Sequence, residues 1–251
     1  MHNLFDLTGS TAIVTGATTG IGQGIALALA AAGARVAGVG RSPMTETQRR
    51  IEQQGGAFRA INADLATIEP VERIIDEAAA WNGHVDILVN NAGIIRRADA
   101  LEFTERDWDD VIDVNLKAVF FLSQAFARRA VRQGRGKIVN IASVLSFQGG
   151  IRVPSYTASK GGVAGLTREL ACEWAAKGIN VNAIAPGYFV TKATAALTQD
   201  SDRNSAILAR IPAGRWGAPE DLGGAAVFLA SRASDYCHGT ILVVDGGWLA
   251  R

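Results

Sequence analysis

Tyr156 and Lys160 are four residues apart and follow the turn-favouring residue Pro154. Residues at this spacing share one face of a helix. A free tyrosine, with a pKa of about 10, is a poor base at neutral pH, but a nearby ammonium group lowers that pKa. Such a phenol can exchange a proton with a substrate oxygen, and Ser143 could hydrogen-bond to the same oxygen. The pattern predicts acid–base catalysis; an amphipathic helix with a surface lysine is the alternative.

A second pair with this spacing, Tyr188 and Lys192, shows that the pattern alone is not specific. Tyr188 follows Pro186-Gly187, which predicts a loop. The residue thirteen positions before Tyr188 is Ala175, whereas Ser143 stands at that distance from Tyr156. We interpret Tyr188 and Lys192 as loop residues near a cofactor or a substrate.

A glycine-rich segment, 16–22, follows the first apolar run of the chain. Glycines let a backbone turn tightly and approach phosphates without interference from Cβ atoms. The N-terminus of a following helix would offer free N–H groups and partial positive charge to a pyrophosphate. The spacing is GxxxGxG, and an ordinary strand-to-helix turn is the alternative. The cofactor-binding residues predicted here are Gly16, Thr18, Thr19, Gly20, Ile21 and Gly22.

Seven short apolar runs must position these residues, with helical patterns between them. The runs mostly lack polar/apolar alternation, which is typical of strands buried on both faces of a parallel sheet. Strands joined by helical crossovers predict a doubly wound α/β fold. The predicted strands are Thr11–Thr15, Arg35–Val39, Phe58–Asn62, Val85–Asn90, Lys137–Ala142, Asn180–Ala185 and Thr240–Asp245.

In a parallel sheet, residues just after the strands gather at one edge, where such folds bind ligands. Besides the glycine-rich segment, three others take that place: Asn90-Asn91-Ala92-Gly93, Ser143 and Pro186-Gly187. The small residues Ala92 and Gly93 would leave room for a flat ligand such as an adenosine, although a polar turn explains the same letters.

Composition excludes several classes of protein. The chain has 251 residues, 48% of them hydrophobic, which is enough for a sizeable core and excludes disorder. Lys plus Arg number 25 and Asp plus Glu 24, so the basic excess of a nucleic-acid-binding protein is missing. The two Cys and three His lack metal-ligand spacing, and we expect no metal. The longest apolar run, 25–34, is too short for a membrane span, and no signal peptide is visible. We expect a cytoplasmic protein.

Together these motifs resemble the short-chain dehydrogenase/reductase superfamily over essentially the whole chain. The matching segments are T-G-A-T-T-G-I-G at 15–22, Asp64-Leu65, N-N-A-G at 90–93, Asn115 in V-N-L-K, Ser143 in N-I-A-S, Y-T-A-S-K at 156–160 and P-G-Y-F-V-T at 186–191. The resemblance implies a single Rossmann-like domain with a seven-stranded sheet. It also implies NAD(P)-dependent hydride transfer to or from a carbonyl or alcohol carbon.

The resemblance also implies roles for individual residues. Tyr156 would be the acid/base, Lys160 would bind the nicotinamide ribose and lower the pKa of Tyr156, Ser143 would orient the substrate oxygen, and Asn115 would support a proton relay. Asp64 would contact the adenine, Asn91 and Gly93 the adenosine side, and Thr191 the nicotinamide amide. The other cofactor-binding residues it implies are Leu65, Ala92, Pro186 and Gly187, with Tyr156 and Lys160.

Four further segments resemble a narrower family, the 2-dehydro-3-deoxy-D-gluconate 5-dehydrogenases, also called 2-deoxy-D-gluconate 3-dehydrogenases. They span 95–103, 145–156, 211–217 and 244–251. The resemblance implies a sugar-acid substrate, either 2-keto-3-deoxy-D-gluconate and its 2,5-diketo form or 2-deoxy-D-gluconate and its 3-keto form. A carboxylate favours a guanidinium partner. We therefore expect Arg152 and one of Arg96 and Arg97, with Arg96 preferred, to bind substrate beside Ser143 and Tyr156. Solvated surface arginines are the alternative.

The cofactor prediction rests on the end of the second predicted strand. A NAD-binding protein should have an acidic residue there to accept the ribose 2′-hydroxyl. The chain has Gly40, followed by Arg41 and Ser42. Arg41 could pair with a 2′-phosphate, which favours NADP(H); NAD(H), the cofactor usually described for the narrower family, is the alternative.

The polar segment 191–211, called the lid segment below, is predicted to cover the substrate. Apolar residues in the C-terminal segment 248–251 suggest burial against another subunit. The resemblance implies a homotetramer, in which Arg251 could reach a neighbour's site. Two other functions stay open: a reductase of another carbonyl substrate, such as a 3-oxoacyl thioester, and a non-catalytic dinucleotide sensor. A sensor would be expected to lack Tyr156 or Lys160.

Overall fold

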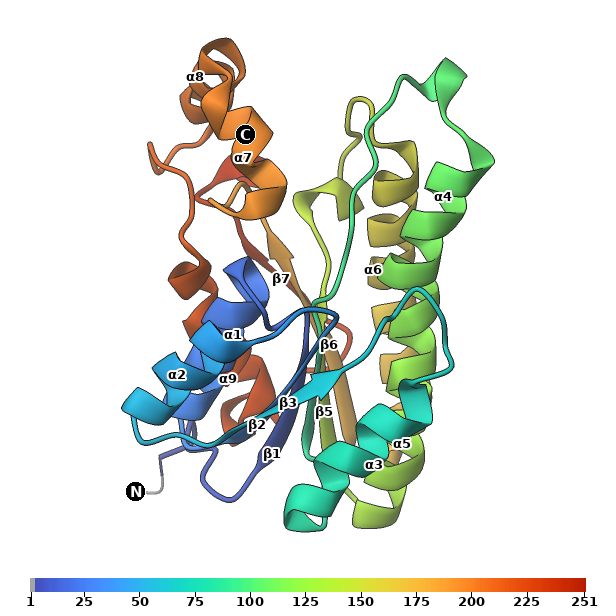
Figure 1. Ribbon diagram of the computed structural model, residues 1–251, viewed down its shortest axis with the longest axis vertical. Helices are drawn as coiled ribbons and strands as arrows, with labels where there is room; N and C mark the ends of the chain where they lie inside the picture. The colour runs from blue at the N-terminus through green and yellow to red at the C-terminus, as the bar shows by residue number, and fades with distance from the viewer. Residues whose placement is uncertain (1–2) are drawn as a thin grey trace.

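A parallel sheet of seven strands lies between two layers of helices in the computed structural model, which describes residues 3–251 (Figure 1). The strand order is β3-β2-β1-β4-β5-β6-β7. This confirms the predicted single α/β domain. The strands are β1 (Thr11–Thr15), β2 (Arg35–Gly40), β3 (Phe58–Asn62), β4 (Ile87–Asn90), β5 (Gly136–Ile141), β6 (Ile179–Pro186) and β7 (Ile241–Val244).

The helices divide between the two faces of the sheet (Figure 1). One face carries α1 (Gly20–Ala31), α2 (Thr45–Gln53) and α9 (Gly223–Ala230). The other carries α3 (Val71–Asn82), α4 (Glu105–Ile112), α5 (Ala118–Gln133) and α6 (Pro154–Trp174). In the lid segment, α7 (Ala195–Gln199) and α8 (Ser201–Arg210) rise beyond the carboxyl edge of the sheet. None of the helices within 3–251 has the length and apolar character of a membrane span.

Alternating side chains of the central strands enter two separate cores. In β1, Ile13 packs in the core that holds Phe126, while Val14 packs in the core that holds Ile25. Every residue of β1, β4 and β6 is buried. The predicted burial on both faces is therefore confirmed for these three strands.

Two predicted strands are not buried on both faces. Arg59 and Asn62 of β3 are exposed, and Val243 of β7 is 37% exposed. Both strands are the edges of the sheet, where each has only one neighbouring strand. The apolar pattern was wrong about their burial because it does not distinguish an edge strand from a central one.

Local signals explain where several helices begin and end. Pro154 stands in the first turn of α6, where its missing N–H costs nothing. The hydroxyl of Thr104 caps α4 by accepting from the N–H of Asp107. Gly83 and Gly134 end α3 and α5 in the left-handed conformation.

Candidate active site

The loop between β1 and α1 has the shape that a dinucleotide phosphate requires. Gly16 and Gly20 have left-handed φ angles of 68° and 60°. A Cβ atom on Gly22 would lie 2.2 Å from the carbonyl oxygen of Gly16, so the turn has no room for a side chain there. Thr19 makes no side-chain capping bond, and the first turn of α1 has no acidic residue. The N–H groups at this helix end are available to a phosphate, and the loop fits a dinucleotide cofactor.

A threonine that the sequence did not single out joins this loop to the next one. The hydroxyl oxygen of Thr15 accepts hydrogen bonds from the backbone N–H groups of Asn91 and Ala92, both at 2.9 Å. The side-chain nitrogen of Asn91 donates in return to the carbonyl oxygen of Thr15 at 2.8 Å. Asn91 thus holds two ligand-binding loops together. The signal in the sequence was a hydroxyl at a strand end, which is too common to be diagnostic.

The residues predicted to bind the adenosine end follow β2 and β3. Arg41 and Ser42 come after β2, and Asp64 and Leu65 come shortly after β3. A guanidinium nitrogen of Arg41 lies 3.8 Å from a carboxylate oxygen of Asp64, and both side chains are more than half exposed. The structure therefore brings Arg41 and Asp64 close together.

Ser143, Tyr156 and Lys160 come together at the carboxyl end of β5. The hydroxyl oxygen of Ser143 accepts from the N–H of Leu145 at 3.1 Å, which leaves its proton free to donate. The buried ammonium of Lys160 lies 5.6 Å from the ring centre of Tyr156 and donates to the carbonyl oxygen of Ile141 at 2.6 Å. The predicted shared helix face is present.

Burial controls the protonation of both catalytic groups. It raises the pKa of Tyr156, and a hydrogen bond with Ser143 and the charge of Arg97 offset part of that rise. Burial also lowers the pKa of Lys160 to about 8. Ser143 and Arg97 thus favour the phenolate, and the effect of Lys160 on the pKa of Tyr156 stays a prediction.

Asn115 lies in a π-helical turn, Asp113–Lys117, between α4 and α5. Its buried side chain binds the backbone of Ile94 twice: the oxygen accepts from the N–H at 2.8 Å, and the nitrogen donates to the carbonyl at 2.9 Å. The nitrogen also lies 3.3 Å from the hydroxyl of Ser159, which in turn donates to the carbonyl of Tyr156. Asn115 therefore connects the segment after β4 to the catalytic helix, and π-helical turns are common at functional sites.

The segment after β6 closes the cofactor side of the site. A Cβ on Gly187 would lie 2.7 Å from the Cα atom of Asp245, so Pro186-Gly187 passes close against the end of β7. The Thr191 methyl group lies 3.4 Å from where a Cβ of Gly20 would be. Thr191 therefore lies beside the loop between β1 and α1, while Gly187 lies against the end of β7.

Tyr188 of the second tyrosine–lysine pair packs among aromatic residues. Its ring centre lies 5.5 Å from that of Trp216 and 4.5 Å from that of Trp248. Lys192 is exposed at the start of the lid segment. The structure places the two in different surroundings, unlike Tyr156 and Lys160.

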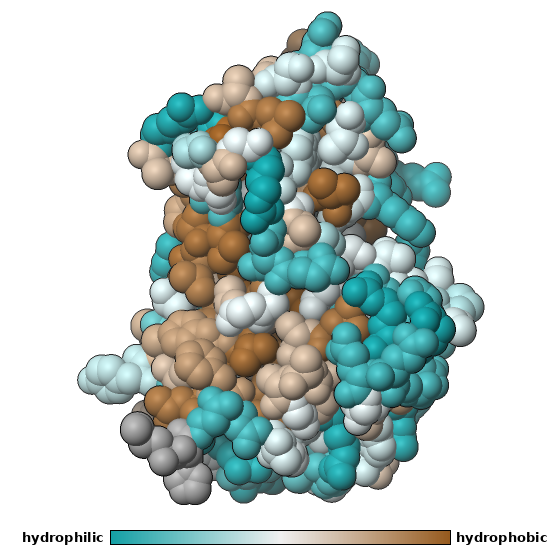
Figure 2. All heavy atoms as spheres, turned by 90° about the vertical axis from the view of Figure 1, so that its left-hand side faces the viewer, coloured by the Kyte–Doolittle hydropathy of each residue, from teal (hydrophilic) through white to brown (hydrophobic). Residues whose placement is uncertain are grey.

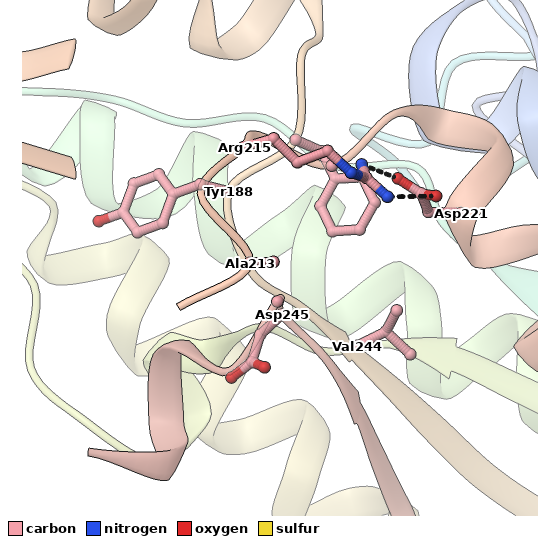
Figure 3. Close-up of a pocket in the computed structure, with 9 residues that line it drawn as sticks. Tyr188, Ala213, Arg215, Asp221, Val244 and Asp245 are labelled. Carbon is pink, nitrogen blue, oxygen red and sulfur yellow. Dashed lines mark hydrogen bonds and ion pairs between the residues drawn. The ribbon is translucent and has the colours of Figure 1, made fainter. Parts of the chain in front are cut away.

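A cavity of about 250 Å³ lies beside the end of β7 (Figure 3). Two hydrogen bonds of 2.6 and 3.0 Å hold the guanidinium of Arg215 against the carboxylate of Asp221 at its rim. Neither Ser143 nor Tyr156 lines this cavity, and within 3–251 no cluster of three or more His, Cys, Asp or Glu could hold a metal ion. The cavity is lined by Tyr188, Phe189, Ala213, Arg215, Gly217, Asp221, Val244, Asp245 and Gly246.

The two adjacent arginines after β4 have different surroundings. Arg96 forms ion pairs with Asp107 at 3.4 Å and Asp110 at 2.9 Å. Arg97 donates to the carbonyl oxygen of Ala193 at 3.1 Å, at the base of the lid segment, and its charge acts on Tyr156. Of the two, Arg97 is the one whose charge acts on Tyr156.

Arg152 is the only residue other than glycine within 3–251 with a positive φ angle, 62°. This conformation costs a residue with a side chain roughly 1–2 kcal/mol. The carbonyl oxygen of Arg152 accepts from the N–H of Ala98 at 3.2 Å, and its side chain is exposed. Strained residues cluster at functional sites, and this one lies between Ser143 and Tyr156 in the chain.

The C-terminal segment packs against its own lid segment. Trp248 is only 5% exposed, and the guanidinium carbon of Arg210 lies 4.0 Å from its ring centre. The guanidinium of Arg251 donates to the carbonyl oxygen of Ala209 at 2.6 Å. The expectation that this end exposes its apolar residues was wrong for Trp248, which the same chain covers, whereas Ala250 is exposed.

Comparisons with known proteins agree with this geometry. A family model described as enoyl-(acyl carrier protein) reductase matches residues 16–249. The 2-dehydro-3-deoxy-D-gluconate 5-dehydrogenase of Escherichia coli (strain K12) is 58% identical, over 98% of each chain. The chain belongs to the short-chain dehydrogenase/reductase family. The family resemblance inferred from the motifs is confirmed, and the chain is an NAD(P)-dependent oxidoreductase that acts on CH–OH groups.

Solved structures of other family members have the same fold. A candidate 2-deoxy-D-gluconate 3-dehydrogenase from Agrobacterium tumefaciens, solved with bound NADP, is 61% identical with a TM-score of 0.92, over 99% of this chain and 100% of that one. A gluconate 5-dehydrogenase from Burkholderia cenocepacia J2315, in complex with NADP and tartrate, is 42% identical with a TM-score of 0.93, over 99% and 98%.

Proposed function

We propose that this short-chain dehydrogenase/reductase interconverts 2-keto-3-deoxy-D-gluconate and its 2,5-diketo form, as the name of its relative from E. coli describes. Oxidation of 2-deoxy-D-gluconate to its 3-keto form is a second reaction of the same site. The observation that carries the proposal is Arg97 beside Tyr156, since a guanidinium next to the acid/base suits a substrate that carries a carboxylate.

The catalytic roles follow from the contacts. Tyr156 gives its proton to the carbonyl oxygen during reduction and takes it back during oxidation. Ser143, whose hydroxyl oxygen accepts from the N–H of Leu145, directs its proton to the phenol oxygen of Tyr156 and would donate it to that substrate oxygen. Lys160 supplies a positive charge beneath the phenol, and Asn115 positions the helix that carries Tyr156. A nicotinamide ring bound at this edge of the sheet supplies or accepts the hydride.

For the cofactor, we infer NADP(H). Gly40 stands where NAD-binding proteins carry a carboxylate, and Arg41, which follows it, can pair with a 2′-phosphate. Its ion pair with Asp64 is long and exposed, so it competes weakly. The related structures from A. tumefaciens and B. cenocepacia contain NADP. The Arg41→Ala variant should lose at least about tenfold of the NADP⁺ preference, since a charge-assisted pair contributes about 1.5–3 kcal/mol. Wild-type preference for NAD⁺ would contradict this inference.

For the substrate carboxylate, we infer Arg97 as the better member of the adjacent pair. The two aspartates that hold Arg96 already neutralise its charge, whereas Arg97 binds only a backbone carbonyl. Arg152, also predicted to bind substrate, lies beside the segment after β4, since its carbonyl oxygen accepts from the N–H of Ala98 at 3.2 Å, and its side chain is exposed. Arg97→Gln should raise KM for the sugar acid more than Arg96→Gln does; the reverse order would restore Arg96 as the candidate.

Two other functions predict different outcomes. A 3-oxoacyl thioester reductase would act on a substrate with a long phosphopantetheine arm; the family model is described as an enoyl-(acyl carrier protein) reductase, which is a different reaction. A dinucleotide sensor has no need of Tyr156 and Lys160, which are both in place. The proposed function differs from the thioester reductase in its acidic substrate. It differs from the sensor because it turns substrate over.

Initial-rate oxidation of 2-keto-3-deoxy-D-gluconate with NAD⁺ and with NADP⁺ tests the proposal. We expect turnover by the wild type and a loss of about 100-fold or more in kcat for Tyr156→Phe, which removes the proton-transfer group. Cofactor binding by the variant, measured by calorimetry, serves as the control for folding. Turnover that survives Tyr156→Phe would refute the catalytic assignment whatever the substrate.

The homotetramer and the cytoplasmic location stay predictions. Apolar areas lie among polar ones on the face that α1, α2 and α9 form (Figure 2). Val243 on the edge strand β7 is 37% exposed, and an exposed strand edge can pair with another chain. Light scattering on the purified protein would show a mass near four times 26.4 kDa if the tetramer forms.

A further inference from the structure

One face of the lid helix α8 is turned toward the catalytic residues. Ile207 packs against the small cluster of Val144, Ile211 and Trp248, and Val144 is the residue after Ser143. Arg203 lies four residues before Ile207 and therefore shares its face of the helix. Arg203 is exposed and lies on the side of α8 that carries Ile207.

A second contact fixes the rotation of α8. The side-chain oxygen of Asn204 accepts from the indole N–H of Trp216 at 2.8 Å, and the ring of Trp216 meets Tyr188 edge-on. Burial raises the pKa of Tyr188, and the charges of Arg210 and Arg203 offset part of the rise. Arg203 is therefore close to the aromatic residues Tyr188 and Trp216 under the lid segment.

Arg97 reaches the same space from the segment after β4. Its guanidinium donates to the carbonyl oxygen of Ala193, so it touches the base of the lid segment. Burial and the nearby charge of Arg203 lower the pKa of Arg97. Two guanidinium groups, one from the body of the domain and one from the lid segment, thus repel each other close to Tyr156.

No carboxylate within 3–251 forms an ion pair with Arg97 or Arg203, whereas neighbouring Arg96 has two such partners. Like charges held together without a counter-ion are unfavourable. An anion placed between them would remove the repulsion and gain charge-assisted hydrogen bonds from both sides. Arg97 and Arg203 together therefore have the properties of an anion-binding site.

We propose that Arg203 and Arg97 together hold the carboxylate of the substrate, so that the lid segment closes preferentially over acidic substrates. This inference rests on the proposed sugar-acid function and adds a specificity residue in the lid segment. A neutral substrate would leave the two charges facing each other and would be disfavoured by that repulsion.

The test compares the sugar acid with its uncharged methyl ester in wild type, Arg203→Gln and Arg203→Lys. We expect Arg203→Gln to lower kcat/KM for the acid by about 10- to 100-fold, as loss of a charge-assisted contact would. For the ester, kcat/KM should stay unchanged or rise, because the repulsion between the two guanidinium groups is removed. Arg203→Lys keeps the positive charge but lacks the planar guanidinium that can bind a carboxylate through two hydrogen bonds. It should therefore recover part of the lost kcat/KM for the acid. Arg106→Gln, which removes an exposed arginine of α4 outside the site, is the matched control and should change neither substrate.

The outcomes separate this inference from the proposed function. Equal losses for acid and ester would mean that Arg203 only shapes the lid segment, and an unchanged rate with the acid would mean that it does not bind the carboxylate; either result overturns the inference alone. Calorimetry of the NADP⁺-loaded wild type with the acid shows whether the protein binds the sugar acid at all. If the wild type neither binds nor oxidises the acid, the proposed function fails and the carboxylate site fails with it.

Discussion

Replacing Lys160 by methionine should change how the stability of the protein depends on pH. Lys160 is 5% exposed, and burial lowers its pKa from 10.5 to about 8. The unfolded chain therefore binds a proton more tightly than the folded chain does. Between pH 8 and pH 10.5 the unfolded state carries more protons, and the free energy of unfolding rises with pH.

The size of the effect follows from the shift. A pKa unit corresponds to about 1.4 kcal/mol, so the charged Lys160 costs the fold about 3 kcal/mol at neutral pH. The two pKa values predict that about 2 kcal/mol of this cost disappears between pH 7 and pH 9.5. Lys160→Met has no group to titrate, and the difference in stability between variant and wild type should shrink by that amount over the window.

Urea unfolding at pH 7, 8, 9 and 9.5, at one protomer concentration, measures the difference. Lys192→Met removes an exposed lysine at the start of the lid segment and should behave as the wild type does. If Lys160→Met and wild type show the same pH dependence, burial of Lys160 does not control its protonation. A wild type that loses stability relative to the variant as pH rises would mean that the pKa is raised, and would refute the reasoning.

Three further substitutions test the framework of the site. Gly22→Ala would place a Cβ 2.2 Å from the carbonyl oxygen of Gly16. It should weaken NADP⁺ binding at least about tenfold in calorimetry, since the loss of one charge-assisted contact already costs that much. Gly165→Ala is the control and should bind NADP⁺ normally, because a Cβ at Gly165 would have no atom within 4 Å. Thr15→Val leaves two backbone N–H groups of the next loop without their acceptor and should cost about 2 kcal/mol in urea unfolding; a neutral result would mean that water replaces the hydroxyl. Phe126→Ala, at a side chain 1% exposed, should cost about 3–5 kcal/mol, and a cost below about 1 kcal/mol would contradict the packed core.

Much of the fold and part of the site could be predicted from local patterns. The unbroken apolar run of β1 indicated a strand covered on both faces, and all five of its residues are buried. Gly16 and Gly20 marked the left-handed positions of the first loop. The four-residue spacing placed Tyr156 and Lys160 on one helix face. These features depend on the backbone period and on the missing Cβ, which are properties of neighbouring residues.

Other features depended on distant segments. Arg96 and Arg97 are chemically identical and adjacent, and nothing in their local sequence ranks them for the site. Arg96 turns to the aspartates of α4, ten or more residues away, whereas Arg97 turns to the lid segment nearly a hundred residues away. Likewise Trp248 is covered because the chain end returns to its own lid segment.

The sequence by itself determined the class of fold, the edge of the sheet where ligands bind, and the set of catalytic residue types. The tertiary structure alone decided which strands form the exposed edges, which arginine faces Tyr156, and how burial sets the protonation of Tyr156 and Lys160. The physical reason is range: backbone periodicity and glycine conformation act between neighbours along the chain, while desolvation and charge interactions depend on whatever the fold brings within a few ångströms.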